Sequence, residues 1–272
     1  GDSLRIVHHL QQLEREAKKA GGQVIVLIGN HEAMIMTGDL RYTAPGEFAA
    51  FVDGQSAKRR DALFDRDRKY IEATFRKEDK SLTAAAIRDR WYRQTPLGMI
   101  EHQQAWSASG ELGKWMLLHK AVVQVGDTIF VHGGISPAYA PIGDAAINRR
   151  VVDAIAARET EPSSIINDPL GPLWYRGMAG LPPETADGSK PIQESVSAQL
   201  DRLLPLRRAR RIVIGHTPIL SGVTVLENGR LARIDSGNSR AYGGRPGYLE
   251  IIGPTATAHS VDRPPAAEGA IP

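Results

Sequence analysis

The sequence predicts an α/β fold, because a helical pattern leads directly into a strand-like segment and further strand-like segments follow later in the chain. Residues 4–20 carry apolar side chains at helical spacing, with Lys18 and Lys19 in the last turn and Gly21 directly after it. Residues 24–28 are all apolar and mostly β-branched, which is typical of a strand covered on both faces.

Residues 47–120 predict a mostly helical insertion. Aromatic side chains are spread through this stretch, and no strand-like segment interrupts it. Charged residues crowd residues 58–80, as expected for the solvated face of a helix. A second interpretation of the charged stretch is a lid or a docking surface for a phosphorylated partner.

After the insertion, strand-like segments return. Residues 121–125 and 128–131 flank Gly126 and Asp127, a pair that favours a hairpin turn. A helix is expected at residues 145–158, and residues 162–191 are rich in Pro and Gly, as loops are. The remaining expected strands are residues 212–214, 223–226, 231–234 and 248–252. From Pro254 the chain is rich in Pro and Ala and is expected to be peripheral.

The composition excludes several classes of function. The chain has 272 residues and no Cys, which excludes disulfides, thiolate metal sites and cysteine nucleophiles. Its 34 basic and 31 acidic residues leave a net charge of +3, which gives no reason to propose nucleic acid as a partner. No apolar run reaches the length of a membrane span. The first residue is Gly1, so we expect that a natural start and any signal peptide lie upstream, and the N-terminus leaves the location open.

Three predicted strands end at polar residues that lie beside glycines. Asn30 and His31 follow residues 24–28, His132 follows residues 128–131, and His216 follows residues 212–214. The carboxyl ends of strands are where α/β sheets collect their sites, so Asn30, His132 and His216 are candidate metal ligands. Their oxygen and nitrogen donors suit Mn, Fe or Zn. For each histidine alone, a hydrogen-bonded structural role is the other interpretation.

Other polar residues lack this position. We expect surface or packing roles for His8, His9, His102, His119 and His259. Asp235 is expected to accept a hydrogen bond in a turn.

Five motifs carry a resemblance to known proteins. Residues 29–32 (Gly-Asn-His-Glu), 131–137 (Val-His-Gly-Gly-Ile-Ser-Pro) and 214–217 (Ile-Gly-His-Thr) resemble, in this order, the calcineurin-like metallophosphoesterase superfamily. Residues 36–42 (Met-Thr-Gly-Asp-Leu-Arg-Tyr) and 171–177 (Gly-Pro-Leu-Trp-Tyr-Arg-Gly) are similar to the bacterial Shewanella-like protein phosphatases. The resemblance implies a metallophosphoesterase-type β-sandwich flanked by helices.

The resemblance also implies domain limits and residue roles. The metallophosphoesterase domain would span residues 1–253, with the helical insertion at about 47–120 and a tail at 254–272. Asn30, His132 and His216 would bind one metal ion, and His31 would be the acid that protonates the leaving oxygen. Two divalent metal ions would activate a water that attacks a phosphomonoester.

Two further residues have two interpretations each. The guanidinium of Arg176 could hold phosphate oxygens, or it could lie on the surface over Trp174. Glu32 could be a first-turn helix acid or could support the ligands, and we favour support over direct chemistry.

The chain departs from the family pattern at its start. The family's first motifs, Asp-x-His and Gly-Asp-x-x-Asp-Arg-Gly, supply the other metal's ligands and are absent from this chain, and Asp2 is interpreted as a residue that caps the first helix. At most one metal site is therefore supported here. We expect this chain alone to be inactive or nearly so, and the full protein to be an enzyme.

The resemblance favours a phosphoprotein phosphatase that acts on phosphotyrosine or on phosphoserine and phosphothreonine, with small phosphoesters as further substrates. The alternatives are a dinucleoside polyphosphate hydrolase and a non-catalytic metal-binding or scaffold protein. A bacterial, exported or periplasmic protein is the favoured source and location, and the cytoplasm is the alternative.

Overall fold

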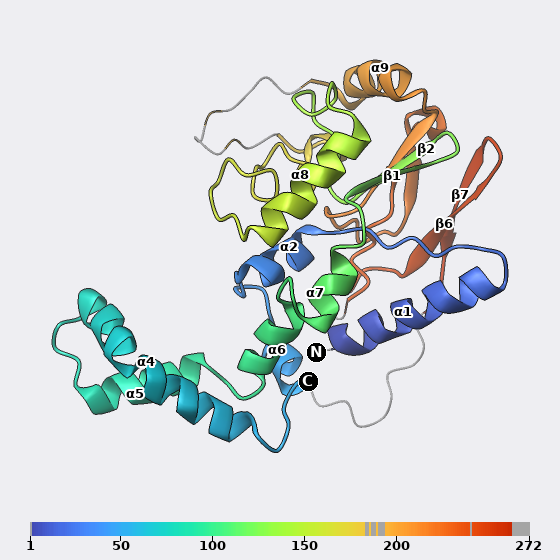
Figure 1. The fold of residues 1–272 in the computed structure, drawn as a ribbon. Helices are drawn as coiled ribbons and strands as arrows, with labels where there is room; N and C mark the ends of the chain where they lie inside the picture. Colours follow the sequence, from blue (N-terminus) through green and yellow to red (C-terminus); the bar gives the residue numbers. More distant parts are fainter. Residues whose placement is uncertain (1, 183–184, 186–188, 190–193, 240, 263–272) are drawn as a thin grey trace. The chain divides into compact units, whose positions relative to one another are not determined.

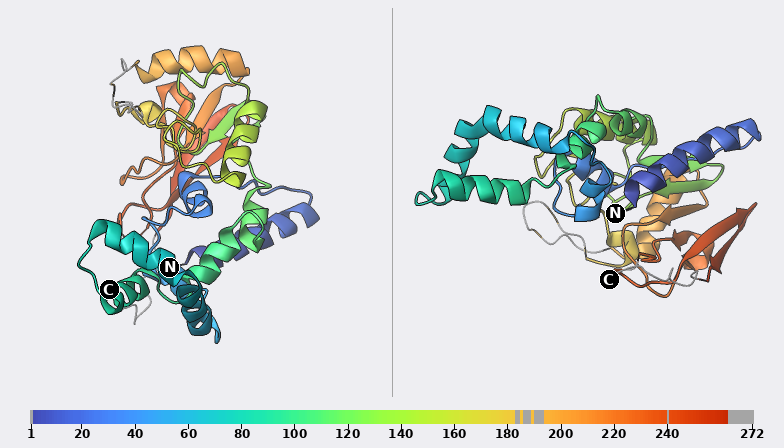
Figure 2. Two further views of the ribbon diagram at one scale, coloured as in Figure 1. Left: turned by 60° about the vertical axis from the view of Figure 1, so that its left-hand side comes forward. Right: turned by 90° about the horizontal axis from the view of Figure 1, so that it is seen from below.

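The computed structural model describes residues 2–182, 185, 189, 194–239 and 241–262, and the chain forms two compact units. The helical unit comprises residues 1–26 and 34–118, and the sheet unit comprises residues 27–33 and 119–272. Figures 1 and 2 show the elements of both as ribbons. The domain limits that the sequence predicts stay a prediction.

The helical unit begins with α1, which spans Ser3–Lys19 and confirms the helix expected at residues 4–20. Helix α2 (Asn30–Thr37) starts in the sheet unit and ends in the helical unit. The rest of the helical unit is helical, as expected, since no described residue between 47 and 118 belongs to a strand. Its helices are α3 (Pro45–Ala49), α4 (Ser56–Glu78), α5 (Ala84–Gln94), α6 (Met99–Trp106) and α7 (Glu111–Met116). None of the described helices combines the length and the apolar character that crossing a bilayer requires.

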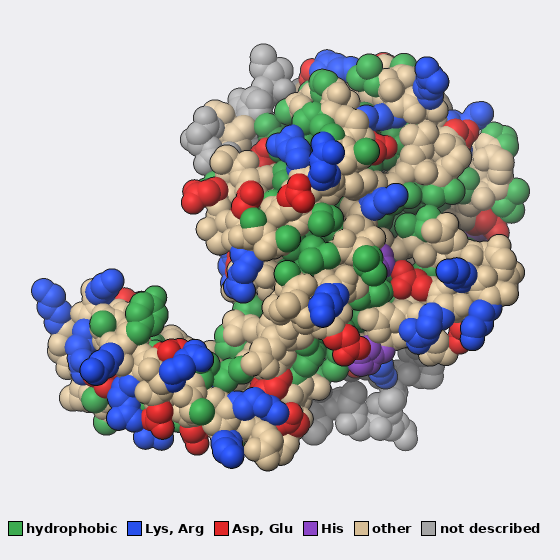
Figure 3. All heavy atoms as spheres, in the orientation of Figure 1, with side chains coloured by type: hydrophobic (Ala, Val, Ile, Leu, Met, Phe, Trp, Pro, Cys, Tyr) green, Lys and Arg blue, Asp and Glu red, His purple; other side chains and the backbone are tan. Residues whose placement is uncertain are grey.

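Helices α4 and α5 form a hairpin with a small core of its own. Phe64, Ile71 and Phe75 of α4 pack with Ile87 of α5, and Trp91 adds a partly buried ring. Lys and Arg side chains cover much of the hairpin's outer surface, with Asp and Glu among them (Figure 3). The charged stretch is therefore a solvated helical face, as its composition predicts, and its docking role stays a prediction.

His102 of α6 is a packing residue, as the sequence predicts. Its side chain is buried, and its ring meets those of Phe48 and Phe51 edge-on, with 5.2 Å between ring centroids in both pairs. Burial among these rings lowers the pKa of His102, because the charged imidazolium loses its hydration there.

We expect His102→Phe to make the protein less sensitive to acid. The unfolded chain takes up a proton near pH 6.5 that the buried His102 resists, so the wild type loses stability as the pH falls below that value. The substitution removes this loss, which is at most about 1.4 kcal/mol per pH unit. Urea unfolding at pH 7, 6 and 5 measures it, with His9→Phe on the exposed face of α1 as the control. Parallel curves for wild type and His102→Phe would contradict the assignment.

The sheet unit contains a mixed five-stranded sheet in the order β1-β2-β3-β5-β4. Its strands are β1 (Val122–Val125), β2 (Thr128–Val131), β3 (Arg211–Ile214), β4 (Thr224–Leu226) and β5 (Leu231–Arg233). The central strands β2, β3 and β5 are parallel, and the two edge strands run antiparallel to their neighbours. Gly126, with φ +59°, lies in the tight turn between β1 and β2 that the sequence predicts.

Elements lie on both sides of this sheet (Figure 1). Helix α8 (Asp144–Ala156) covers one side, where the Asn148 amide bonds to the backbone of Ala121 and Val122. On the other side β6 (Gly247–Ile252) and β7 (Thr255–Ser260) form a two-stranded sheet. A mostly apolar cavity of about 570 Å³ is lined by residues of β1, β2, β3 and β6. This arrangement confirms the predicted α/β fold.

Two elements, β7 and α9 (Val196–Arg207), were not expected from the sequence. Strand β7 lies in the segment that composition marks as peripheral, and residues 263–272 of that expected tail lie outside the described residues. Helix α9 was obscured by Pro205 in its last turn, although Ser195 caps its start by accepting a hydrogen bond from the Ala198 N–H.

The prediction of a strand at residues 24–28 is wrong. Only Leu27 forms a β-bridge, with Lys120, and Ile25 is 42% exposed. An apolar run becomes a buried strand only when partners flank it, and among the described residues this segment pairs at that single position.

Candidate active site

The ends of β2 and β3 bring the candidate ligands together. These strands pair in parallel with Val131 opposite Ile214, so the residues that follow them emerge at the same edge. The pairing continues one step further, because the Gly215 N–H donates to the His132 carbonyl over 2.8 Å. His132 follows β2 directly, His216 follows Gly215, and Asn30 is the first residue of α2.

Asn30, His132 and His216 converge, as the sequence predicts. The Nε2 atom of His132 lies 2.8 Å from Oδ1 of Asn30 and 3.1 Å from Nδ1 of His216. Bonds of about 2.1 Å from one metal ion place neighbouring donor atoms roughly 3 Å apart, so these distances fit three ligands of one cation. No group of three or more His, Asp or Glu side chains in the described part of the chain is arranged for a metal, and the metal site at Asn30, His132 and His216 stays a prediction.

Burial keeps both imidazoles neutral. It lowers the pKa of His216 to about 3, with the charges of His132, Arg176 and His31 as lesser causes. It also lowers the pKa of His132 to about 4, helped by the charges of His31 and Arg176. Both rings therefore keep a lone pair for a cation at neutral pH.

His216 lies in a strained turn. Its φ is +64°, and the Thr217 N–H donates to the Gly215 carbonyl over 2.7 Å, which closes a three-residue turn around it. The Nε2 atom of His216 is buried without a hydrogen-bond partner among the described residues. Strain of this kind concentrates at functional sites.

Gly29 allows two site residues to approach its backbone. Its N–H donates to Oε2 of Glu32 over 3.0 Å, so Glu32 caps the first turn of α2. A Cβ on Gly29 would lie 2.7 Å from that Glu32 oxygen and 3.0 Å from Nδ1 of His132. Glu32 therefore lies in the helix's first turn, next to the same glycine as the His132 ring, and its supporting role stays a prediction.

We expect Gly29→Ala to displace the His132 ring and the Glu32 cap. Contacts this short force the neighbours to move, so the free energy of unfolding should fall by about 1–3 kcal/mol. The control is Gly215→Ala, where the added Cβ would meet the His132 carbonyl oxygen at an ordinary 3.4 Å. Urea denaturation compares the two variants, and an equal loss in both would contradict the crowding at Gly29.

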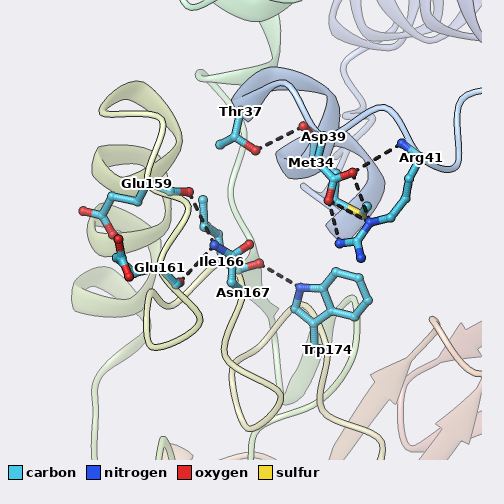
Figure 4. Close-up of polar contacts among 9 residues, drawn as sticks. All are labelled: Met34, Thr37, Asp39, Arg41, Glu159, Glu161, Ile166, Asn167 and Trp174. Atoms are coloured by element: carbon cyan, nitrogen blue, oxygen red, sulfur yellow. Dashed lines mark hydrogen bonds and ion pairs between the residues drawn. The ribbon is translucent and has the colours of Figure 1, made fainter. Parts of the chain in front are cut away.

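The loop of residues 164–177 brings Trp174 and Arg176 to the site. The Trp174 ring meets that of His216 at 84°, with 5.5 Å between centroids. Its Nε1–H donates to the Ile166 carbonyl over 2.8 Å (Figure 4). Arg176 is half-buried, and its positive charge contributes to the lowered pKa of both His132 and His216. No cation–π contact of Arg176 with Trp174 is found in the described part of the chain.

The remaining predicted residues lie as follows. His31 is exposed as the second residue of α2. Arg41, part of the motif at residues 36–42, belongs to the helical unit, where its guanidinium pairs with the Asp39 carboxylate at 2.6 Å (Figure 4). Asp235 accepts from the Gly237 N–H over 3.0 Å, which confirms its turn role. The contact of Trp174 with His216 could not be predicted from the sequence, where Trp174 is part of a motif and a possible partner of Arg176.

Known proteins resemble this chain over most of its length, although no family model matches it. The chain is 27% identical over 261 residues to Shewanella-like protein phosphatase 2 of Arabidopsis thaliana, covering 92% of this chain and 62% of that protein. It is 26% identical over 257 residues to an uncharacterized protein of Schizosaccharomyces pombe, covering 92% of this chain and 61% of that protein. The chain therefore spans about three fifths of the length of these relatives.

A third relative, an uncharacterized protein of Acanthamoeba polyphaga mimivirus, is 24% identical over 258 residues, which cover 85% of this chain and 86% of that protein. These relatives are eukaryotic or viral, so the expected bacterial source is not confirmed.

Solved structures share the fold. The cold-active protein-tyrosine phosphatase of a psychrophilic Shewanella species superposes with a TM-score of 0.60 at 22% identity, covering 95% of this chain and 64% of that chain. A second structure of a cold-active protein tyrosine phosphatase gives a TM-score of 0.59 at 23% identity, over 90% of this chain and 57% of that chain. The chain thus has the fold of these phosphatases and is similar in sequence to a Shewanella-like protein phosphatase.

Proposed function

We propose that this chain supplies one metal site and the phosphate-binding side chain of a phosphoprotein phosphatase, a hydrolase of phosphomonoesters. The observation that carries the proposal is the convergence of Asn30 Oδ1, His132 Nε2 and His216 Nδ1 within hydrogen-bond distance. The phosphatase names of the similar proteins support it. No cysteine nucleophile is available in the chain, so a route through activated water fits its composition.

The donor set suits a divalent ion of the Mn, Fe or Zn class, because one amide oxygen and two neutral imidazoles are ligands that such ions accept. When bound, the metal would supply an acidified water and a positive charge beside the phosphate. The set has no carboxylate, so it leaves the full charge of the cation to attract an anionic substrate. A second metal ion belongs to the proposal for the complete protein only.

Two side chains would handle the substrate. Arg176 lies on the same loop as Trp174, its charge acts on both imidazoles, and it would hold phosphate oxygens through its forked N–H groups. His31 is exposed at the start of α2, one residue after the proposed ligand Asn30. It would give its proton to the oxygen of the leaving alcohol or phenol. The accepted substrates would be phosphorylated proteins and small phosphoesters.

We expect Asn30→Ala, His132→Ala and His216→Ala each to lower metal affinity by about tenfold or more, since each removes one donor. Asn30→Asp keeps an oxygen donor and should keep the metal, and His31→Ala should keep it as well. Equilibrium dialysis against Mn²⁺ or Zn²⁺ with elemental analysis measures the content. His259→Ala is the control, because that ring stacks on Tyr248 of the β6–β7 hairpin. Unchanged metal in the three Ala variants would refute the ligand assignment.

Arg176→Met should weaken phosphate binding to the metal-loaded chain by about tenfold, because charged hydrogen bonds to the anion are lost. Titration calorimetry with inorganic phosphate measures the affinity. Arg149→Met, on the exposed face of α8, is the matched control. Equal affinity in Arg176→Met and wild type would place Arg176 outside the site.

Substrate class is tested on the protein as its gene encodes it, with phosphopeptides and diadenosine tetraphosphate compared under the same metal. Cleavage of phosphopeptides supports the proposal. Cleavage of the dinucleotide alone would favour the dinucleoside polyphosphate hydrolase, and metal binding without hydrolysis would favour the scaffold.

A further inference from the structure

We propose that Trp174 is a positioning residue: its ring holds the His216 imidazole in the orientation in which Nδ1 faces His132 and Asn30. The inference deepens the proposed function and rests on it. It assigns a task to a residue that touches neither the proposed metal nor the phosphate directly.

The Nδ1 atom of His216 lies 3.1 Å from Nε2 of His132, and no hydrogen bond is found at the opposite ring nitrogen among the described residues. A metal-binding histidine ordinarily donates its second ring nitrogen to a carboxylate, a carbonyl or water, and this bond sets the direction of the ligating nitrogen. In His216 the second nitrogen is Nε2, which is buried without a hydrogen-bond partner among the described residues. On this side of the ring, a contact with a neighbouring side chain takes the place of that hydrogen bond.

The backbone conformation of His216 is strained as well. His216 has φ +64°, in the left-handed region, where residues other than glycine are strained. The turn leads into Thr217, whose own hydroxyl is also buried without a partner. Neither the turn nor its neighbour offers a polar group that the structure shows holding the imidazole.

The Trp174 ring is in contact with the His216 ring. The Trp174 and His216 rings are nearly perpendicular, at 84°, with 5.5 Å between their centroids. This is the edge-to-face geometry that aromatic rings favour, and rotation of either ring away from it loses contact. The His216 and His132 rings are 4.9 Å apart at 57°, so the His216 ring is in contact with both Trp174 and His132.

Hydrogen bonds hold Trp174 itself in place. Its Nε1–H donates to the Ile166 carbonyl over 2.8 Å, and its backbone N–H donates to Gly171 over 3.1 Å. Two residues before Trp174, the Pro172 carbonyl accepts a hydrogen bond from the Gly133 N–H over 2.8 Å. Gly133 directly follows His132. The loop that carries Trp174 is thus tied to the strand end that carries His132.

The loop is anchored on its far side as well. The Asn167 side chain donates to the carbonyls of Glu159 and Glu161, at 3.4 and 3.1 Å (Figure 4). Gly171 packs so closely that a Cβ there would lie 2.6 Å from the Ile165 carbonyl oxygen. These ties make the loop a fixed support, so the position of Trp174 is set independently of any bound metal.

The test separates positioning from simple space filling. Trp174→Phe keeps an aromatic ring against His216, whereas Trp174→Leu and Trp174→Met keep an apolar side chain of smaller volume and remove the ring. We expect Co²⁺ affinity, measured by calorimetry, to stay within about threefold of wild type in the Phe variant and to fall by about tenfold or more in the other two. Thermal unfolding and circular dichroism show whether each variant is folded. Two non-aromatic variants are used so that the test can still be made if one of them does not fold.

Trp91→Leu is the matched control, because Trp91 packs in the α4–α5 hairpin and its loss should lower the melting temperature without changing Co²⁺ affinity. The absorption spectrum of bound Co²⁺, which depends on ligand geometry, should change in Trp174→Leu and not in Trp91→Leu. If the wild type binds Co²⁺ and the folded Leu and Met variants bind it equally well, the positioning role is overturned alone. If the wild type binds no divalent metal, the proposed function fails together with it.

Discussion

The parallel pairing of β2 with β3 is the constraint on which the candidate site depends. The register of Val131 with Ile214, extended by the bond from Gly215 to the His132 carbonyl, leaves His132 and His216 next to each other at the sheet edge. A shift of this register by one residue would turn the two strands' side chains to opposite faces and separate the imidazoles. The chemistry of the site is thus a consequence of backbone hydrogen bonds that contain no catalytic group.

Sequence predicts well those parts that depend on local pattern. The hairpin at Gly126, helix α8 and the strands that precede His132 and His216 all follow from periodicity and turn residues. The convergence of Asn30, His132 and His216 could also be anticipated, because each follows a strand-like segment beside a glycine. The parallel pairing of β2 with β3 brings His132 and His216 together, whereas Asn30 reaches them from the start of α2.

The failures have physical causes as well. Residues 24–28 have the composition of a buried strand, yet strand formation depends on partners that composition does not reveal. Helix α9 was not predicted because it contains Pro205. A proline usually indicates the end of a helix, but here it lies in the last turn. The contact of Trp174 with His216 joins a loop to a strand end 42 positions away, and no local pattern encodes such a pair.

The turn at His216 creates a conflict between folding and chemistry. A left-handed backbone conformation costs a side chain with a Cβ about 1–2 kcal/mol, and glycine adopts it without that cost. A glycine at this position would therefore relax the chain while deleting a nitrogen donor. The backbone cost at position 216 is therefore tied to the imidazole that the residue contributes to the candidate site.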